Sequence, residues 1–300
     1  MKGLTLAAGF VLATIAQAQT NEGVDKAIRW LPSDTETLVV IQSNSFSIPS
    51  EPKQPLSLVA WPLGIPPKGL QSLTKLPAQF LVHGARKFKY PQSIGVGSFE
   101  GASIAGLDSQ NEAIASSVLT KSKLKSIAIG KETVYQFPYS FEDGTKLVGL
   151  IGVKNHCLVF GTNASFVKTL VARMDDQAKD RAFPEDLEEW KYVDRSAPFW
   201  AIRHINPATH LTGMGLDMGD KKIRGYGVSI SSNLVLRVVS ISDNPDAMTL
   251  VKGLWTQEEL KPKLTALSST ATEILLGPEP QQFGRGFFFT LFALGYPIAI

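Results

Sequence analysis

Cysteine and histidine are scarce in this chain of 300 residues. It contains one cysteine, Cys157, and four histidines. A single cysteine excludes an intrachain disulfide, so the fold depends on its hydrophobic core. Cys157 precedes the apolar run Leu158-Val159-Phe160, which predicts a buried and unreactive thiol rather than a nucleophile.

A concentrated charge of one sign is also absent. The formal net charge is +3, and it falls to +2 if the N-terminal segment that contains Lys2 is removed. The densest basic run, Lys121, Lys123 and Lys125, has alternate spacing that predicts the solvated edge of an extended segment. We therefore expect no nucleic-acid partner, since nucleic-acid binding requires a concentrated basic face.

No apolar run reaches the ~20 residues that a membrane-spanning helix requires. The N-terminal run Leu4 to Ile15 follows Lys2 and precedes Ala16-Gln17-Ala18, the small-x-small pattern of a signal-peptide cleavage site. Residues 1–19 are thus predicted to be a signal peptide rather than a transmembrane helix. We expect an exported protein, periplasmic or extracellular, whose residues 20–300 form a single α+β domain, with two similar lobes dividing near 140–146 as an alternative.

The C-terminal run Gly286 to Ile300 carries no charge and contains four phenylalanines. With Pro297 near its end, it is too short and too interrupted for a membrane span. A run that is apolar on both faces predicts a buried terminal strand. The alternative is a tail, Phe287 to Ile300, that contacts a membrane or a partner.

A strand, strand, helix pattern recurs along the chain. Its central example has strands at 147–153 and 156–160, a tight turn at Lys154-Asn155, and a helix capped by Asn163 with an apolar stripe that ends at Met174. Two further units are predicted from strands at 93–99 and 102–107 with a helix from Ser109, and from strands at 225–231 and 234–241 with a helix after Asn244. The sequence therefore predicts an α+β fold with largely antiparallel sheets, built from repeated units with the helices packed on one face.

The segments between these units are predicted from capping and periodicity. We expect a proline-rich ordered strap over 46–67 and helical character over 70–82. A hairpin is predicted around Gly130-Lys131. A capping box joins Ser109 to Glu112, and Pro184 begins a short helix that ends at Val193. The remaining expected elements are a helix over 21–31, a strand over 37–42 and a strand over 197–205.

The helix at 21–31, the turn Leu31-Pro32-Ser33-Asp34-Thr35 and the following apolar strand occur directly after the signal peptide. This opening resembles that of a group of exported bacterial proteins with a domain of unknown function. The resemblance covers about fifteen residues and implies a bacterial envelope protein. It implies no activity, cofactor or site residue.

Motifs that would identify a catalytic or metal site are missing. His204 and His210, followed by Asp217 and Asp220, lie close in sequence, but their spacing matches no metal motif. The segment Gly101 to Ala105 approaches the nucleophile elbow without its last glycine, and the glycine-rich segments 95–101 and 213–219 do not fit a nucleotide fingerprint. Acidic pairs such as Glu188-Glu189 are predicted to be solvated. We assign no catalytic, cofactor-binding or metal residue and expect no cofactor.

Two functions remain open from the sequence. The first is a non-catalytic exported protein that binds an apolar ligand or another envelope protein, motivated by the 44% hydrophobic composition. The second is a hydrolase whose site is assembled from distant residues around His204 and His210, because such sites are defined by geometry rather than spacing.

Overall fold

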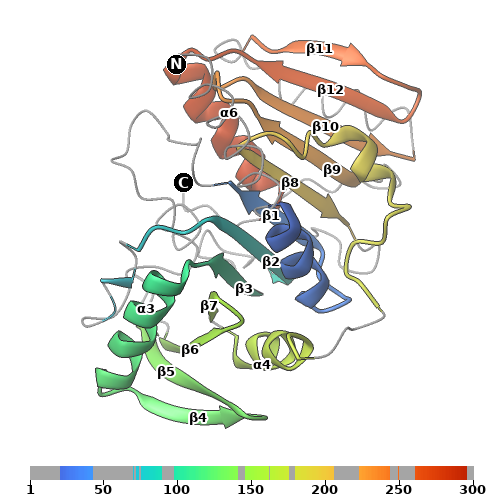
Figure 1. Cartoon of the computed structure of the whole chain (residues 1–300). Coiled ribbons are helices and arrows are strands. Elements are labelled where there is room, and N and C mark those ends of the chain that lie inside the picture. The colour runs from blue at the N-terminus through green and yellow to red at the C-terminus, as the bar shows by residue number, and fades with distance from the viewer. Residues whose placement is uncertain are drawn as a thin grey trace, which may run out of the picture.

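In the described part of the chain, one antiparallel sheet of twelve strands organises the fold, in the order β11-β12-β10-β9-β8-β1-β2-β3-β7-β6-β5-β4 (Figure 1). This computed structural model describes residues 21–42, 70, 72–73, 76–89, 98–140, 146–161, 163–175, 180–205, 223–243, 249 and 261–295. The strands are β1 (Thr37–Ile41), β2 (Phe80–Lys89), β3 (Ser98–Gly106), β4 (Lys125–Ile129), β5 (Glu132–Ser140), β6 (Lys146–Lys154), β7 (Cys157–Gly161), β8 (Phe199–His204), β9 (Ile223–Ile230), β10 (Leu236–Ser242), β11 (Lys263–Ala266) and β12 (Ala271–Leu276). The predicted α+β class and antiparallel sheet are confirmed.

The short strand β1 lies at the centre of the sheet. It pairs with β2 on one side and with β8 on the other, so that Val40 lies opposite both Val82 and Trp200. All five residues of β1 are buried. Because a strand covered on both faces must be apolar throughout, the run Thr-Leu-Val-Val-Ile suits this position. The predicted strand at 37–42 is confirmed.

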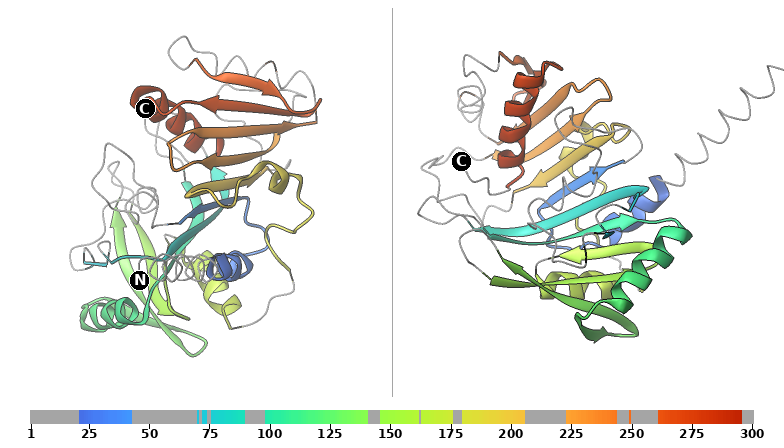
Figure 2. Two further views of the ribbon diagram at one scale, coloured as in Figure 1. Left: turned by 45° about the horizontal axis from the view of Figure 1, so that its top comes forward. Right: turned by 90° about the vertical axis from the view of Figure 1, so that its left-hand side faces the viewer.

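Helices cover both faces of the sheet (Figure 2). Helix 21–30 and α4 (Ala164–Arg173) pack on the face that carries Leu38, Val40 and Ile202, which we call the η3 face after the 3₁₀ helix η3 (Glu188–Tyr192). Helices α3 (Ser109–Lys121) and α6 (Pro280–Ala293) pack on the opposite face, which we call the α6 face. The prediction that the helices pack on one face is therefore wrong.

The β6–β7 hairpin and α4 form much as the central unit predicts. Asn155 and His156 occupy the turn with φ of 51° and 57°, as a two-residue hairpin requires, so the turn lies one residue later than predicted. Asn163 caps α4, since its side-chain oxygen accepts a hydrogen bond of 2.9 Å from the Phe166 amide. The hairpin at Gly130-Lys131 is confirmed as well, with Gly130 at φ +60°.

The predicted hairpin at 93–107 is wrong, because β3 runs without a turn from Ser98 to Gly106 and pairs with β2 and β7. Gly101 lies inside this strand, where its carbonyl is 2.5 Å from the position that a Cβ on Gly161 would occupy. The small residues at this point therefore serve the close approach of strands rather than a turn.

Three helix predictions also require correction. Residues from Phe80 onward form β2 rather than a helix over 70–82, because they pair with β1 and β3. Asp108, rather than Ser109, caps α3, and Glu112 bonds His156 instead of closing a capping box. Within the segment 184–193, where a helix is predicted, the structure has only the 3₁₀ helix η3 over Glu188–Tyr192. The strap at 46–67 lies wholly outside the described residues, and the helix predicted after Asn244 lies outside them except at Thr249.

The C-terminal run is helical in α6 from Gly286 to Ala293, so the predicted terminal strand is wrong there, and residues 296–300 lie outside the described residues. Phe283, Phe287 and Leu294 recur at helical spacing and are buried on the α6 face. Two buried side chains hold the helix end: Arg203 Nη1 donates a hydrogen bond of 2.8 Å to the Ala293 carbonyl, and Thr37 Oγ1 donates one of 2.9 Å to the Leu294 carbonyl. A cation suits this end, where the helix dipole is negative. No described helix is long and apolar enough to cross a bilayer.

Candidate functional site

The helix η3 lies directly on the backbone of β9. A Cβ on Gly225 would be 2.3 Å from Glu189 Oε1, and one on Gly227 would be 3.2 Å from the Tyr192 Cβ. The alternate glycines of Gly225-Tyr226-Gly227 share one face of the strand. Because neither has a side chain, η3 can pack directly against the strand backbone there. A group of polar contacts surrounds this helix on the η3 face.

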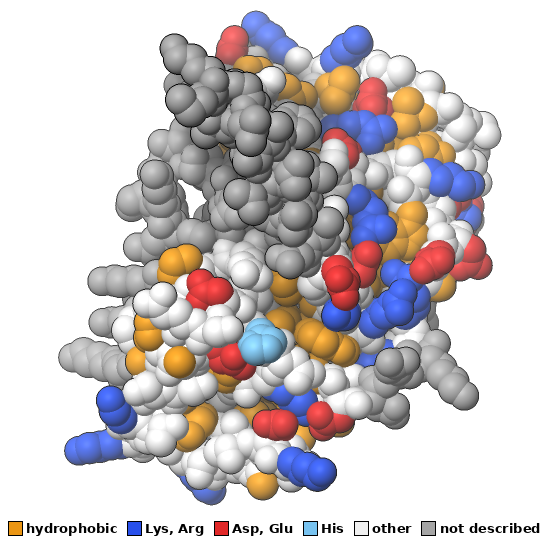
Figure 3. Space-filling view, in the orientation of Figure 1, with side chains coloured by type: hydrophobic (Ala, Val, Ile, Leu, Met, Phe, Trp, Pro, Cys, Tyr) orange, Lys and Arg blue, Asp and Glu red, His pale blue; other side chains and the backbone are white. Residues whose placement is uncertain are grey.

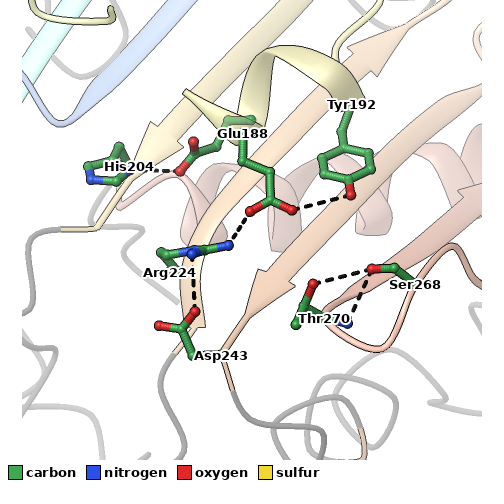
Figure 4. Close-up of polar contacts among 8 residues, drawn as sticks. Glu188, Tyr192, His204, Arg224, Asp243, Ser268 and Thr270 are labelled. Atoms are coloured by element: carbon green, nitrogen blue, oxygen red, sulfur yellow. Dashed lines mark hydrogen bonds and ion pairs between the residues drawn. The ribbon is translucent and has the colours of Figure 1, made fainter. Parts of the chain in front are cut away.

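A buried carboxylate and a half-exposed imidazole form the core of the site (Figure 4). Glu189 Oε1 lies 2.8 Å from His204 Nδ1; the Glu189 side chain is 2% exposed and that of His204 is 42% exposed. When Nδ1 donates to the carboxylate, Nε2 is the ring nitrogen left for other contacts. The pair therefore fixes both the position and the tautomer of His204.

The charges around His204 favour its protonated form. The hydrogen bond that His204 donates to Glu189 raises the pKa of His204 above its ordinary value of 6.5, while burial opposes the increase. The carboxylate of Glu36 raises this pKa further, and the nearby guanidinium of Arg224 lowers it. The net direction is upward, because the direct hydrogen bond to the charged form outweighs desolvation.

Further ion pairs join η3 to the neighbouring strands. Arg224 on β9 pairs with Glu188 and also with Asp243, whose Oδ1 is 3.1 Å from Nη1, and the Tyr192 hydroxyl donates to Glu188 at 3.4 Å. Arg237 on β10 pairs with Glu273 on β12 at 2.6 Å. Basic and acidic side chains accordingly alternate over the upper right of the surface in Figure 3.

An aromatic contact holds the middle of η3. The indole rings of Trp190 and Trp200 meet edge to face with centroids 5.9 Å apart, and the Arg195 guanidinium lies over both rings. At the end of η3, Tyr192 packs against a small apolar patch that consists of Val239, Ile241 and Ala271, all fully buried. The segment is thus fixed by both apolar and charged contacts.

The structure separates the described histidines and gives each a partner of its own. His83 on β2 is fully buried, and its Nδ1 lies 2.9 Å from Ser103 Oγ on β3. Burial lowers the pKa of His83 to about 3, so this imidazole is neutral at all physiological pH values. His156 in the β6–β7 turn lies 2.6 Å from Glu112 on α3. His210 lies outside the described residues, so its predicted proximity to His204 stays a prediction.

The structure also places the serine of the segment that resembles a nucleophile elbow, and the single cysteine. Ser103 lies in the middle of β3 rather than in a hairpin, and both it and His83 are inaccessible. Cys157 is buried as predicted, and burial together with the Glu112 charge raises the pKa of its thiol to about 12, which disfavours the nucleophilic thiolate. Among the described residues, no group of three or more histidine, cysteine or acidic side chains could hold a metal ion.

Sequence reasoning missed Glu189, which was expected to be solvated with Glu188. The carboxylate is instead buried against Gly225 and His204. Two signals were available: the glycines at alternate positions of β9, and the apolar Trp190 next to the acidic pair. Together they indicate a short segment that packs closely on a strand.

The Glu189–His204 pair beside η3 can bind a proton on the imidazole or transfer one from it. An imidazole oriented by a buried carboxylate is suited to general acid–base chemistry and to a response to pH. Within the described part of the chain, the Glu189 carboxylate is the one side chain that bonds the His204 ring. Comparisons with protein-family models, curated proteins and solved structures found no match to this chain.

Proposed function

We propose that this protein is an exported, non-catalytic binding protein that takes an apolar ligand or an apolar segment of another envelope protein. Helix α6 supports this proposal. The chain carries no charge from Gly286 onward, yet Leu291 and Ala293 within α6 remain only partly buried. An uncharged helix surface that stays partly accessible offers apolar contacts to a ligand or to a partner segment.

Binding of a fluorescent fatty acid to the mature chain tests the proposal. We expect saturable binding that Leu291→Gln weakens several-fold, because the substitution places a polar group on α6. The control is Ile114→Gln, which replaces a 40% exposed apolar side chain on α3 and should leave binding unchanged. Absence of binding, or equal loss in both variants, would contradict the assignment to α6.

The export and the bacterial origin of the protein are part of the same proposal. They rest on the cleavage pattern at Ala16-Gln17-Ala18 and on the resemblance of about fifteen residues after it, around the turn Leu31-Pro32-Ser33-Asp34-Thr35, to exported bacterial proteins. Expression of the full chain in a bacterium, followed by N-terminal sequencing of the periplasmic fraction, should give a protein that begins after residue 19. Retention of residue 1 in that protein would contradict export by this route.

We also infer that the fold contains an internal repeat. The hairpin β2–β3 leads into α3, and the hairpin β6–β7 leads into α4. The strands β9 and β10 form a third hairpin at a corresponding place in the chain. The repeat would place two or more related units within the single sheet.

Hydrolysis is the second candidate function, and the Glu189–His204 pair favours it. The pair could activate a water molecule or a hydroxyl group through His204 Nε2. The test is hydrolysis of a p-nitrophenyl ester by the mature chain, with His204→Gln compared against His156→Gln. Loss of turnover in His204→Gln alone supports a hydrolase, whereas equal rates in the two variants contradict it.

A further inference from the structure

We propose that the Glu189–His204 pair is a pH-sensitive latch, which holds η3 on the sheet beside the Val239–Ile241–Ala271 patch and loosens as the pH rises. The inference goes beyond the proposed function, because it concerns the motion of η3 and requires no ligand. It rests on the seating of η3, on the burial of Glu189 and on the exposure of His204.

The Glu189–His204 pair is one of the contacts that seat η3 on the sheet, and it is the one whose charge depends on a histidine. Glu189 is buried against Gly225 with its carboxylate 2.8 Å from His204 Nδ1. A buried carboxylate that loses its cationic partner is strongly destabilised. The imidazole is 42% exposed, so it exchanges protons with solvent without prior unfolding.

The charged groups that face His204 come from three places. Glu189 lies on η3 itself, and Glu188 on the same helix is engaged by Arg224 of β9. Arg224 also pairs with Asp243 after β10. Glu36, directly before β1, accepts the backbone amide of His204 through its carbonyl oxygen at 2.8 Å. The carboxylates of Glu189 and Glu36 favour the charged imidazole, and Arg224 opposes it.

The sign of the pH effect follows from these contacts. The pKa of His204 is raised in the folded protein, mainly by its hydrogen bond to Glu189. The stabilisation is therefore complete below the unfolded value near 6.5 and is lost as the pH rises through the raised folded value. Above that point the imidazole is neutral, so the Glu189 carboxylate keeps a hydrogen-bond donor but loses the cationic charge of its partner.

Loosening of η3 has a defined structural consequence. Tyr192, the last residue of η3, packs against Val239, Ile241 and Ala271. Its carbonyl accepts a hydrogen bond from Arg237 Nη1, so the end of η3 also contacts the Arg237–Glu273 pair. Movement of η3 would uncover apolar surface on β10 and β12, near the β11 edge of the sheet, and would free these polar groups.

Hydrogen exchange of the mature chain, measured by mass spectrometry at pH 6 and pH 8.5, tests the latch. After correction for intrinsic exchange rates, we expect protection of the peptide that covers 187–193 to fall several-fold at the higher pH. Protection of α4 should not change. In His204→Gln the η3 protection should be low at both pH values, and His156→Gln should behave like the wild type.

The proposal is overturned if η3 protection in the wild type is independent of pH, if His204→Gln keeps the dependence, or if α4 loses protection in parallel. A second measurement needs no variant. The midpoint of the η3 exchange profile should coincide with the titration midpoint of the His204 ring protons in NMR spectra. Distinct midpoints would overturn the latch even if the variant failed to fold.

Discussion

Gly225 makes the site at η3 sterically feasible. A Cβ at this position would lie 2.3 Å from Glu189 Oε1 and 2.8 Å from the Arg203 carbonyl oxygen. Distances below 3.0 Å require the neighbours to shift, and the carbonyl belongs to the backbone of the adjacent strand. The glycine is therefore needed for close approach rather than for an unusual backbone conformation.

The substitution Gly225→Ala should lower the free energy of unfolding by about 1–3 kcal/mol, because it overpacks a filled space. It should also move the pKa of His204 back toward 6.5, since Glu189 must withdraw. Denaturant unfolding and NMR titration measure the two effects.

Gly284→Ala is the matched control. Nothing lies within 4 Å of its Cβ position in α6, so the free energy of unfolding should rise by about 0.5–1 kcal/mol. Equal stability of Gly225→Ala and wild type would contradict the steric argument.

The residue scale also shows where sequence reasoning stops. The burial of Cys157 follows from its apolar neighbours, and that prediction is confirmed. The burial of Glu189 depends on Gly225, which is 36 positions away in the chain. A contact between residues so distant in sequence is decided by the packing of η3 on β9, and no local pattern contains it.

Helix α4 is the element that sequence reasoning predicted best. Its cap at Asn163 and its buried stripe of Phe166, Val167, Leu170 and Val171 are confirmed. Both signals are local, because capping and helical periodicity act within a few turns. At its other end, buried Lys154 donates to the Val171 carbonyl at 3.2 Å and pairs with Asp175 at 2.6 Å.

Asn163→Ala should lower the free energy of unfolding by about 0.5–2 kcal/mol, because the Phe166 amide loses its acceptor. Chemical denaturation monitored by circular dichroism measures the change. Asn163→Asp keeps an acceptor oxygen at the cap and should retain most of the stability. If the aspartate variant lost as much stability as the alanine variant, the cap would not explain the role of Asn163.

Elements whose partners are distant in sequence were predicted poorly. The run at 93–107 contains the turn-forming pair Glu100-Gly101, but pairing with β2 and β7 extends β3 through it. The C-terminal run was predicted as a strand because it is apolar throughout. The spacing of Phe283, Phe287 and Leu294 was the helical signal, and the α6 face provides the surface on which that stripe is buried.

At the scale of the whole molecule, β1 connects two halves of the sheet. Strands β2 to β7 lie on one side of it and β8 to β12 on the other. The sequence predicted antiparallel sheets but not this order, because the pairing of β1 with β8 joins residues separated by most of the chain. The single domain over 20–300, with lobes dividing near 140–146 as its alternative, stays a prediction.

Leu38→Ala tests whether the two halves unfold together. Leu38 in β1 is fully buried, so its truncation should lower the free energy of unfolding by about 2–5 kcal/mol. Hydrogen exchange should show the same loss of protection in β7 and in β10, as expected for one cooperative unit. The control Leu267→Ala removes a side chain that is 40% exposed and should cost less than about 0.5 kcal/mol. Loss of protection confined to one half would indicate two independent lobes.

The central position of β1 affects how the chain folds during synthesis. Ile41 leaves the ribosome about 160 residues before its partner Phe199, an interval of roughly 8–32 s at 5–20 residues per second. Throughout this interval one edge of a fully apolar strand has no partner on the nascent chain. Such an edge is a template for intermolecular pairing. The newly made protein should therefore depend on a chaperone that shields residues 37–41 until β8 has been translated.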